Sequence, residues 1–157
     1  MSSVGNKNII DRKSVSLNKE QKAYLAGIID GEGCLFIRPR KYRHGITYVP
    51  GLSIANTNKK LLYTLKSWVG TGCIVERPGK ESYHKPVYAY VLSSLQLGQL
   101  LPQLKLIVKE KQRLILIKVI KILSKRKFGF GNYDYQYGIK KLTMYHQQMK
   151  ELNKRGK

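Results

Sequence analysis

A helical pattern that ends in glycines and passes straight into strand alternation constrains this chain more than any other feature. Asn18 is a candidate helix cap with Gln21 three residues later, and an apolar stripe follows over residues 24–29. The helical pattern stops at Gly31-Glu32-Gly33, and residues 34–40 then alternate in character. The sequence therefore predicts a helix followed at once by a strand, in which Pro39 fits best at an edge or a bulge.

The rest of the chain repeats this alternation of helical and strand-like segments. Turn-prone residues 41–45 lead into a second strand with a bend at Pro50-Gly51, and polar residues 78–85 separate the two strands of a second hairpin. Pro102 marks a break, and the β-branched content of residues 114–123 leaves some strand ambiguity there. The expected elements are a strand at 46–56, a helix at 61–69, strands at 73–77 and 86–92, and helices at 93–101, 114–123 and 139–152.

This order, α-ββ-α-ββ-α-α-α, predicts an α+β fold in one domain. Two hairpins separated by helices form an antiparallel sheet that helices cover on one face, which leaves the other face free to meet a ligand. Residues 1–16 are polar and aperiodic, which predicts a flexible basic arm. We expect the core to span 17–125, and residues 126–157 to form a helical extension of the same domain.

Charge predicts the class of partner. The chain has 30 Lys and Arg against 9 Asp and Glu, a formal charge of +21 with a pI near 10.1, and such a surface attracts polyanions. There is no apolar run long enough to span a bilayer, and the first residues lack the apolar stretch of a signal peptide. We therefore expect a nucleic-acid partner and no membrane, although charge predicts neither sequence choice nor chemistry.

The chain has two cysteines, Cys34 and Cys73. They are too few for a disulfide framework and lack the spacing of a zinc site. We expect buried or groove-facing thiols in a reducing intracellular compartment, either a prokaryotic cytoplasm or an organelle.

Acidic residues are scarce, and two of them, Asp30 and Glu32, lie together at the glycine-rich helix end. A carboxylate at such a turn is often merely solvated. Phosphodiester hydrolysis, however, uses a hard divalent cation, and Mg²⁺ typically takes only one or two protein carboxylates. Gly27 and Gly31 are four residues apart on one helix face, where small residues let two helices approach closely. One motif can thus provide an interface and place acids beside it.

Residues 25–33 read L-A-G-I-I-D-G-E-G, which resembles the signature of the LAGLIDADG homing endonucleases. The family core is likewise α-ββ-α-ββ-α, so the resemblance covers residues 18–123 in element order. It implies a saddle-like antiparallel sheet for DNA with helices on its other face. With a single motif copy, it also implies a homodimer that makes a metal-dependent staggered cut in a long pseudo-palindromic double-stranded site, as intron-encoded enzymes do in intron homing.

The resemblance also implies roles for individual residues. Glu32 takes the place of the metal-binding catalytic carboxylate, with Mg²⁺ as cofactor and Mn²⁺ as a substitute. Asn56 and Lys60 resemble the residues that supply an amide and a base to the active-site water network, and Lys109 resembles a catalytic lysine. The expected dimer interface consists of Gly27, Ile28, Asp30 and Gly31, with Asp30 mainly capping or bracing the paired helices.

Strand alternation separates a basic face from a core face. It places Phe36, Arg38, Arg40 and Tyr42 on one side of the first strand and Leu35 and Ile37 on the other. A two-stranded ribbon fits the major groove, where arginine or lysine donates to guanine. The candidate DNA contacts are Arg38, Arg40, Ser53 and Arg77, with Lys85 beside the second hairpin and Arg43, His44 and Lys80 in peripheral loops.

Other interpretations remain open at the level of sequence. Tyr83, Tyr88 and Tyr90 fit either base stacking or packing within the sheet. An RNA-binding maturase that assists intron splicing belongs to the same family. A basic ribosomal or architectural protein explains the charge, but it leaves Asp30, Glu32 and the glycine pattern unexplained.

Overall fold

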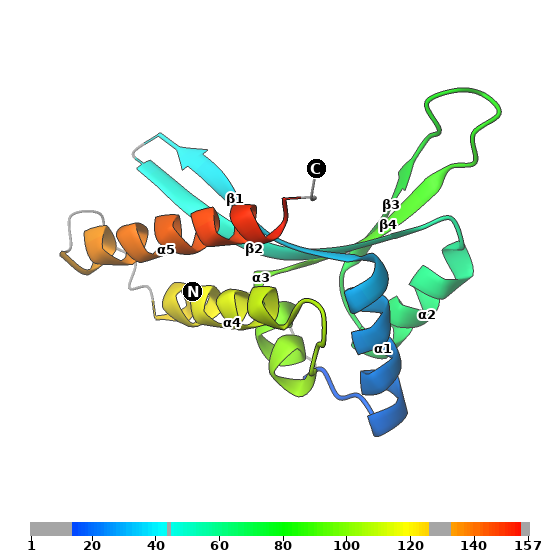
Figure 1. Cartoon of the computed structure of the whole chain (residues 1–157), viewed down its shortest axis with the longest axis horizontal. Coiled ribbons are helices and arrows are strands. Elements are labelled where there is room, and N and C mark those ends of the chain that lie inside the picture. The colour runs from blue at the N-terminus through cyan, green and yellow to red at the C-terminus, as the bar shows by residue number, and fades with distance from the viewer. Residues whose placement is uncertain (1–13, 44, 126–132, 155–157) are drawn as a thin grey trace, which may run out of the picture.

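The computed structural model describes residues 14–43, 45–125 and 133–154 (Figure 1). Within these residues the elements follow the predicted order, which confirms the α+β class and resolves the ambiguity at 114–123 in favour of a helix. The elements are α1 (Lys19–Glu32), β1 (Gly33–Tyr42), β2 (Gly45–Asn56), α2 (Lys59–Val69), β3 (Cys73–Arg77), β4 (Val87–Ser93), α3 (Ser94–Leu100), the 3-10 turn η1 (Leu101–Gln103), α4 (Glu110–Ser124) and α5 (Tyr133–Leu152).

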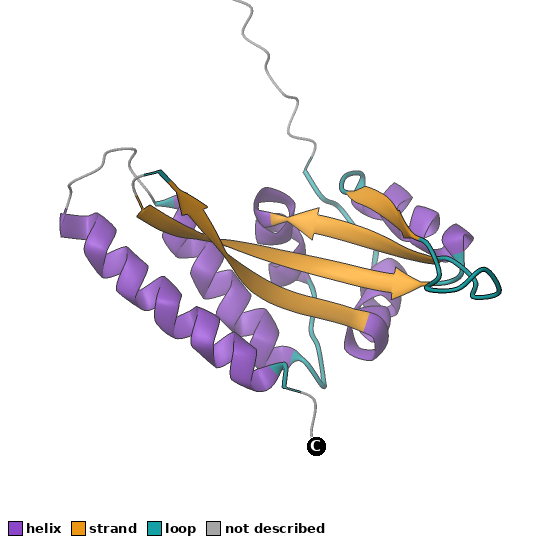
Figure 2. Ribbon diagram, turned by 90° about the horizontal axis from the view of Figure 1, so that it is seen from above, coloured by secondary structure: helices purple, strands orange, loops and turns teal. Residues whose placement is uncertain are grey.

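The four strands form one antiparallel sheet in the order β1-β2-β4-β3. The two hairpins rise away from each other in Figure 1, and α1 to α4 lie below them. Figure 2 looks onto the uncovered face, with the strands in front of the helices. The sheet is therefore saddle-like, with one face covered and one open, as expected. Pro39 lies in β1, an edge strand, also as expected.

The core lies between the sheet and the helices. Leu35, Leu52 and Leu92 face one another across β1, β2 and β4, and all three are fully buried. From α1, Leu25 and Ile29 pack into the same cluster. Apolar burial of this kind stabilises a fold by about 25 cal/mol per Å². The core thus holds the C-terminal end of α1 against the middle of the sheet.

Local signals set the ends of the first two helices. The Asn18 side chain accepts from the Gln21 backbone N–H at 2.8 Å, and the Gln21 side chain accepts from the Asn18 N–H at 3.1 Å, which confirms the capping box. α2 ends at Gly70, whose φ of 82° is in the left-handed region that favours glycine. α1 therefore starts where the sequence predicts.

The chain is already packed before α1 begins. Val15 is buried, its N–H donates to Gln99 Oε1 at 2.9 Å, and its carbonyl accepts from Gln103 at 2.8 Å. Of the predicted arm at 1–16, residues 1–13 lie outside the described residues. The arm ends before the predicted boundary at residue 16, because Val15 is already packed in the core.

The terminal helix α5 packs against the β1–β2 hairpin and α4. Leu142 and Met149 of its predicted stripe are buried, whereas Leu152 remains partly exposed. His146 Nδ1 donates to the Ile37 carbonyl at 2.9 Å, and Asn153 Nδ2 donates to the Leu35 carbonyl at 2.7 Å. The helix thus covers an edge strand that would otherwise be open to pairing. None of the described helices is long and apolar enough to cross a membrane.

Candidate functional site

Glu32 and Asn56 meet where the first helix ends beside the second strand. Glu32 is the last residue of α1 and Asn56 the last of β2, and Asn56 Nδ2 donates to Glu32 Oε2 at 2.7 Å. Asn56 Oδ1 in turn accepts from the Asn58 N–H at 2.7 Å, which fixes the orientation of the amide. Within the described residues, Glu32 Oε1 has no hydrogen-bond partner. The pair therefore presents an oriented, exposed carboxylate with one oxygen available to a ligand.

Asp30 braces the loop before α4 against the end of α1. Its carboxylate accepts from the Ile107 N–H at 2.7 Å and from the Lys109 N–H at 3.0 Å. Burial alone would raise the pKa of Asp30, but hydrogen bonds from three backbone N–H groups and the charge of Lys109 outweigh it, so the pKa is lowered. Asp30 therefore braces the end of α1 within its own chain, and its expected role between paired helices stays a prediction.

Lys109 binds the C-terminal end of α1. Its Nζ donates to the Ile29 carbonyl at 2.9 Å and to the Asp30 carbonyl at 2.7 Å. A cation at this end of a helix also interacts favourably with the helix dipole. Lys109 is therefore brought to the turn of helix that carries Glu32, and its catalytic role stays a prediction.

Lys60 lies apart from this group. It is exposed in the first turn of α2, where its carbonyl accepts from the Thr64 hydroxyl at 2.9 Å. No hydrogen bond or ion pair among the described residues joins its side chain to Glu32. The structure thus joins Glu32 to Asn56 and places Lys109 against the same end of α1, whereas Lys60 stays a prediction without a contact.

The predicted groove contacts lie on the open face of the sheet. Arg38 and Arg40 are exposed on β1, and Arg77 is exposed at the end of β3. Ser53 is half-buried on β2 between Cys34 and Val91. The basic face and the core face of β1 are therefore divided as expected, since Leu35 and Ile37 are buried.

Among the other candidate DNA contacts, the loop residues are exposed where the structure describes them, whereas Tyr90 is buried. Arg43, Lys80 and Lys85 are exposed, whereas His44 lies outside the described residues. Tyr90 is buried and its hydroxyl donates to the Thr71 carbonyl at 2.6 Å, and burial raises its pKa well above the usual range. Base stacking is therefore wrong for Tyr90, because its ring belongs to the core.

Both cysteines are exposed thiols on the open face. The register runs from Cys34 through Ser53 and Val91 to Cys73, one residue from each strand. Three strand spacings of about 4.8 Å separate the two thiols by much more than the roughly 7 Å a disulfide spans. Of the two locations expected for them, the groove-facing one is confirmed.

Sequence reasoning missed the exposed surface around the end of α1. Ile107 and Val108 are 89% and 73% exposed, although both are large and apolar. Alternation and periodicity give no signal in this short loop. At Gly27 and Gly31, an added Cβ would meet nothing within 4 Å. The chain's own packing therefore explains neither the two apolar side chains nor the two glycines.

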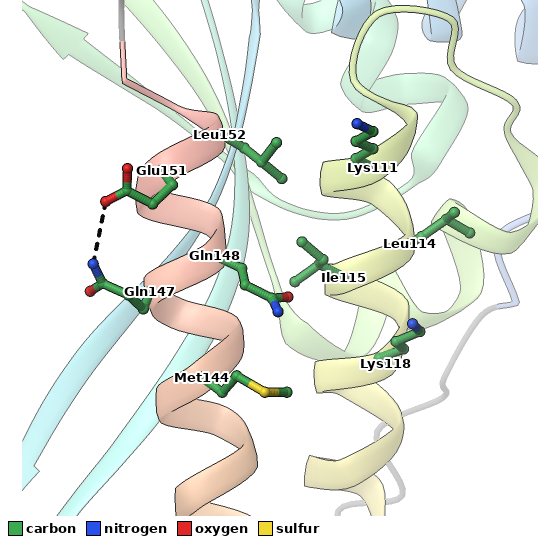
Figure 3. Close-up of a pocket in the computed structure, with 9 residues that line it drawn as sticks. All are labelled: Lys111, Leu114, Ile115, Lys118, Met144, Gln147, Gln148, Glu151 and Leu152. Carbon is green, nitrogen blue, oxygen red and sulfur yellow. Dashed lines mark hydrogen bonds between the residues drawn. The ribbon is translucent and has the colours of Figure 1, made fainter.

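A groove lies between α4 and α5 (Figure 3). It encloses about 700 Å³, and its floor is apolar, with Leu114, Ile115 and Met144 among its lining residues. The carboxylate that lines it belongs to Glu151, which pairs with Lys154 at 2.9 Å. The carboxylate of the groove is thus in an ion pair, whereas Glu32 has no ion pair among the described residues.

No family model matches this chain. It is 31% identical to the DNA endonuclease I-CreI of Chlamydomonas reinhardtii over 120 residues, which cover 70% of this chain and 68% of I-CreI. The chain belongs to the LAGLIDADG homing endonuclease family. The motif resemblance at residues 25–33 is thereby confirmed, and the interpretation as a purely architectural basic protein is wrong.

Solved structures agree with the fold of this homing endonuclease. The archaeal intron-encoded homing endonuclease I-Vdi141I, solved in complex with DNA, has a TM-score of 0.72 at 24% identity and covers 88% of this chain and 87% of its own. I-SmaMI, solved with an uncleaved DNA target and calcium ions, has a TM-score of 0.67 at 25% identity. That match covers 87% of this chain but 46% of I-SmaMI. Both matches extend over most of this chain, and the predicted division into a core at 17–125 and an extension at 126–157 stays a prediction.

Proposed function

We propose that this homing endonuclease works as a homodimer on a long pseudo-palindromic DNA site and makes a Mg²⁺-dependent staggered double-strand cut. The observation that carries the proposal is the Glu32 carboxylate, exposed at the end of α1 and oriented by Asn56 at 2.7 Å. It lies one residue from Gly31, whose missing side chain leaves open space. The acid and a surface suited to close helix approach thus share one turn of α1.

The uncovered face of α1 supports pairing of two chains. Gly27 and Gly31 are four residues apart, hence on one face, and both are exposed. Glycine lowers helix stability by roughly 1 kcal/mol relative to alanine, so two uncovered glycines favour a role outside the single chain. Ile107 and Val108 extend this surface with exposed apolar side chains. The I-SmaMI match, which leaves more than half of that longer chain unmatched, also fits a two-unit enzyme.

The ligand set fits a shared divalent cation. No group of three His, Cys, Asp or Glu residues is close enough to hold a metal in the described part of one chain. Mg²⁺ usually keeps several waters and takes one or two carboxylates, so Glu32 from each of two chains suits it. The ion would activate water and neutralise the charge that develops on the phosphate oxygens, and Mn²⁺ would substitute. I-CvuI has been solved with uncleaved DNA in the presence of Mg²⁺ and, separately, with its own target in the presence of Ca²⁺.

The open face of the sheet supports DNA binding. It carries Arg38, Arg40 and Arg77 on a chain of formal charge +21. A two-fold dimer presents the same surface to each half-site, so the target is expected to be pseudo-palindromic. The free, exposed Cys34 and Cys73 favour a reducing compartment inside a cell.

The test compares the wild type with Glu32→Gln on a plasmid library of candidate insertion sites in Mg²⁺. The control is Glu20→Gln, which removes a carboxylate from the first turn of the same helix. We expect linearised plasmid with the wild type and the control, and none with Glu32→Gln. Equal cutting by Glu32→Gln would rule out Glu32 as the metal-binding catalytic carboxylate. No cutting by the wild type, together with tight binding of structured intron RNA, would favour the maturase instead.

A further inference from the structure

Two arginines on β1 lie over aromatic rings of the same strand. Arg38 Cζ is 4.3 Å from the centroid of the Phe36 ring, and Arg40 Cζ is 5.5 Å from that of Tyr42. A guanidinium within about 6 Å of a ring centroid is attracted by the ring, and the attraction weakens with distance. Arg38 is therefore the more tightly held of the two.

The Phe36 ring packs against Gly51 of the neighbouring strand. Phe36 pairs with Gly51 of β2, and directly opposed residues lie on the same face of a sheet. A Cβ built on Gly51 would lie 2.3 Å from Phe36 Cζ and 2.5 Å from Cε2. Only glycine leaves room for the ring in this position. β2 runs unbroken from Gly45 to Asn56 through Pro50-Gly51, and Gly51 serves close packing.

Gly51, Phe36 and Arg38 thus form a stack on the open face of the sheet. Arginine has many rotamers, and holding its guanidinium in advance reduces the entropy lost when it binds. In the major groove the guanidinium fork matches O6 and N7 of guanine. The third side chain of the row, Ser93, is opposite Gly51 and too short to displace the ring.

We propose that Arg38 reads one guanine in each half-site and that Phe36, seated on Gly51, is its positioning residue. This inference rests on the proposed function, because it assigns a base to the surface that binds DNA there. Arg40 differs, since its partner Tyr42 is 51% exposed near the hairpin tip and the stack is looser. Arg40 therefore adds charge for the phosphates and little base preference.

The experiment selects bound and cut sites from a duplex library in which the half-sites are randomised. With the wild type, one position in each half-site is expected to be guanine. Arg38→Ala is expected to lower the preference at that position by about 5- to 100-fold, the range of one bidentate contact, and to leave other positions unchanged. Arg40→Ala is expected to weaken binding evenly across sequences and to reduce its salt dependence.

The positioning role is tested at the same base. Phe36→Leu is expected to remove about 3- to 10-fold of the guanine preference, as expected from one cation–π contact, while Phe36→Tyr retains it. Gly51→Ala, which leaves the ring chemistry intact but fills its seat, is expected to resemble Phe36→Leu. A purely structural role for Phe36 would instead lower binding to every sequence alike. Circular dichroism of each variant identifies loss of folding, and Gly51→Ala decides the question if Phe36→Leu unfolds.

The outcomes separate this inference from the proposed function. If the wild type selects a site but Arg38→Ala keeps every base preference, the inference is overturned and the endonuclease remains. If Arg38→Ala loses the guanine but folded Phe36→Leu and Gly51→Ala both keep it, the positioning role is overturned. If the wild type neither selects nor cuts any duplex, both proposals fail together.

Discussion

The side chain of Asp30 binds the backbone of Lys109, and the side chain of Lys109 binds the backbone of Asp30. Asp30 Oδ1 accepts from the Lys109 N–H at 3.0 Å, and Lys109 Nζ donates to the Asp30 carbonyl at 2.7 Å. The two residues are 79 positions apart in the chain. Their reciprocal bonds join the C-terminal turn of α1, which carries Glu32, to the loop that precedes α4.

Asp30→Ala is expected to destabilise the protein by about 1–3 kcal/mol. The variant removes the acceptor of the Ile107 and Lys109 N–H groups, and hydrogen bonds to a charged group contribute about this much. Urea unfolding followed by circular dichroism measures the change. Asp30→Asn keeps one acceptor oxygen and is expected to lose less. Equal stability of Asp30→Ala and the wild type would mean that the loop is held by other contacts.

Acidification is expected to weaken the same junction. The folded-state pKa of Asp30 lies below its usual value of 3.8, so its contribution to stability is complete above that value and is lost as the pH falls through the folded pKa. The charge-paired Glu110, whose hydrogen bond from Arg113 lowers its pKa, acts in the same direction. Urea midpoints measured from roughly pH 6 to pH 3 should fall less steeply for Asp30→Asn than for the wild type. Parallel curves would contradict the assignment to Asp30.

Asn56→Ala is expected to reduce single-turnover cleavage by about 10–100-fold, the usual effect of losing a group that orients a metal-binding side chain. The variant frees the Glu32 carboxylate from its 2.7 Å hydrogen bond. Asn56→Gln retains an amide and is expected to recover part of the activity. Cleavage is measured with saturating protein over a range of Mg²⁺ concentrations. If both variants cut as fast as the wild type, the orientation of Glu32 by Asn56 has no catalytic consequence.

Gly27→Leu is expected to block pairing of two chains without harming the fold of one. A Cβ at Gly27 meets nothing within 4 Å in its own chain, and replacing glycine within a helix raises helix stability by up to roughly 1 kcal/mol. The larger side chain would separate two closely packed helices. Sedimentation of the variant should give a mass near one 18.0 kDa chain, with unchanged helix content. Tyr63→Leu, an exposed change on α2, serves as control, and a dimer that survives Gly27→Leu would refute the α1 interface.

The sequence by itself determined the elements and their faces. Capping by Asn18, the alternation of Leu35 and Ile37 with Arg38, and the glycine-rich end of α1 act between neighbours in the chain, so their signals are local. The family resemblance at residues 25–33 also predicted Glu32, and the resemblance at the end of the second strand predicted Asn56, because both resemblances are read along the chain.

Only the tertiary structure decided which of these local features meet. The bonds of Lys109 to α1, the cover that α5 gives β1, and the seat of Phe36 on Gly51 depend on register and packing between elements distant in sequence. A shift of one residue in strand register would move every side chain to the opposite face, and no local pattern specifies such pairings across helices. For this reason Glu32, Asn56 and Lys109 could be named as candidates from the sequence, whereas the contact of Asn56 with Glu32 and the bonds of Lys109 to α1 could not.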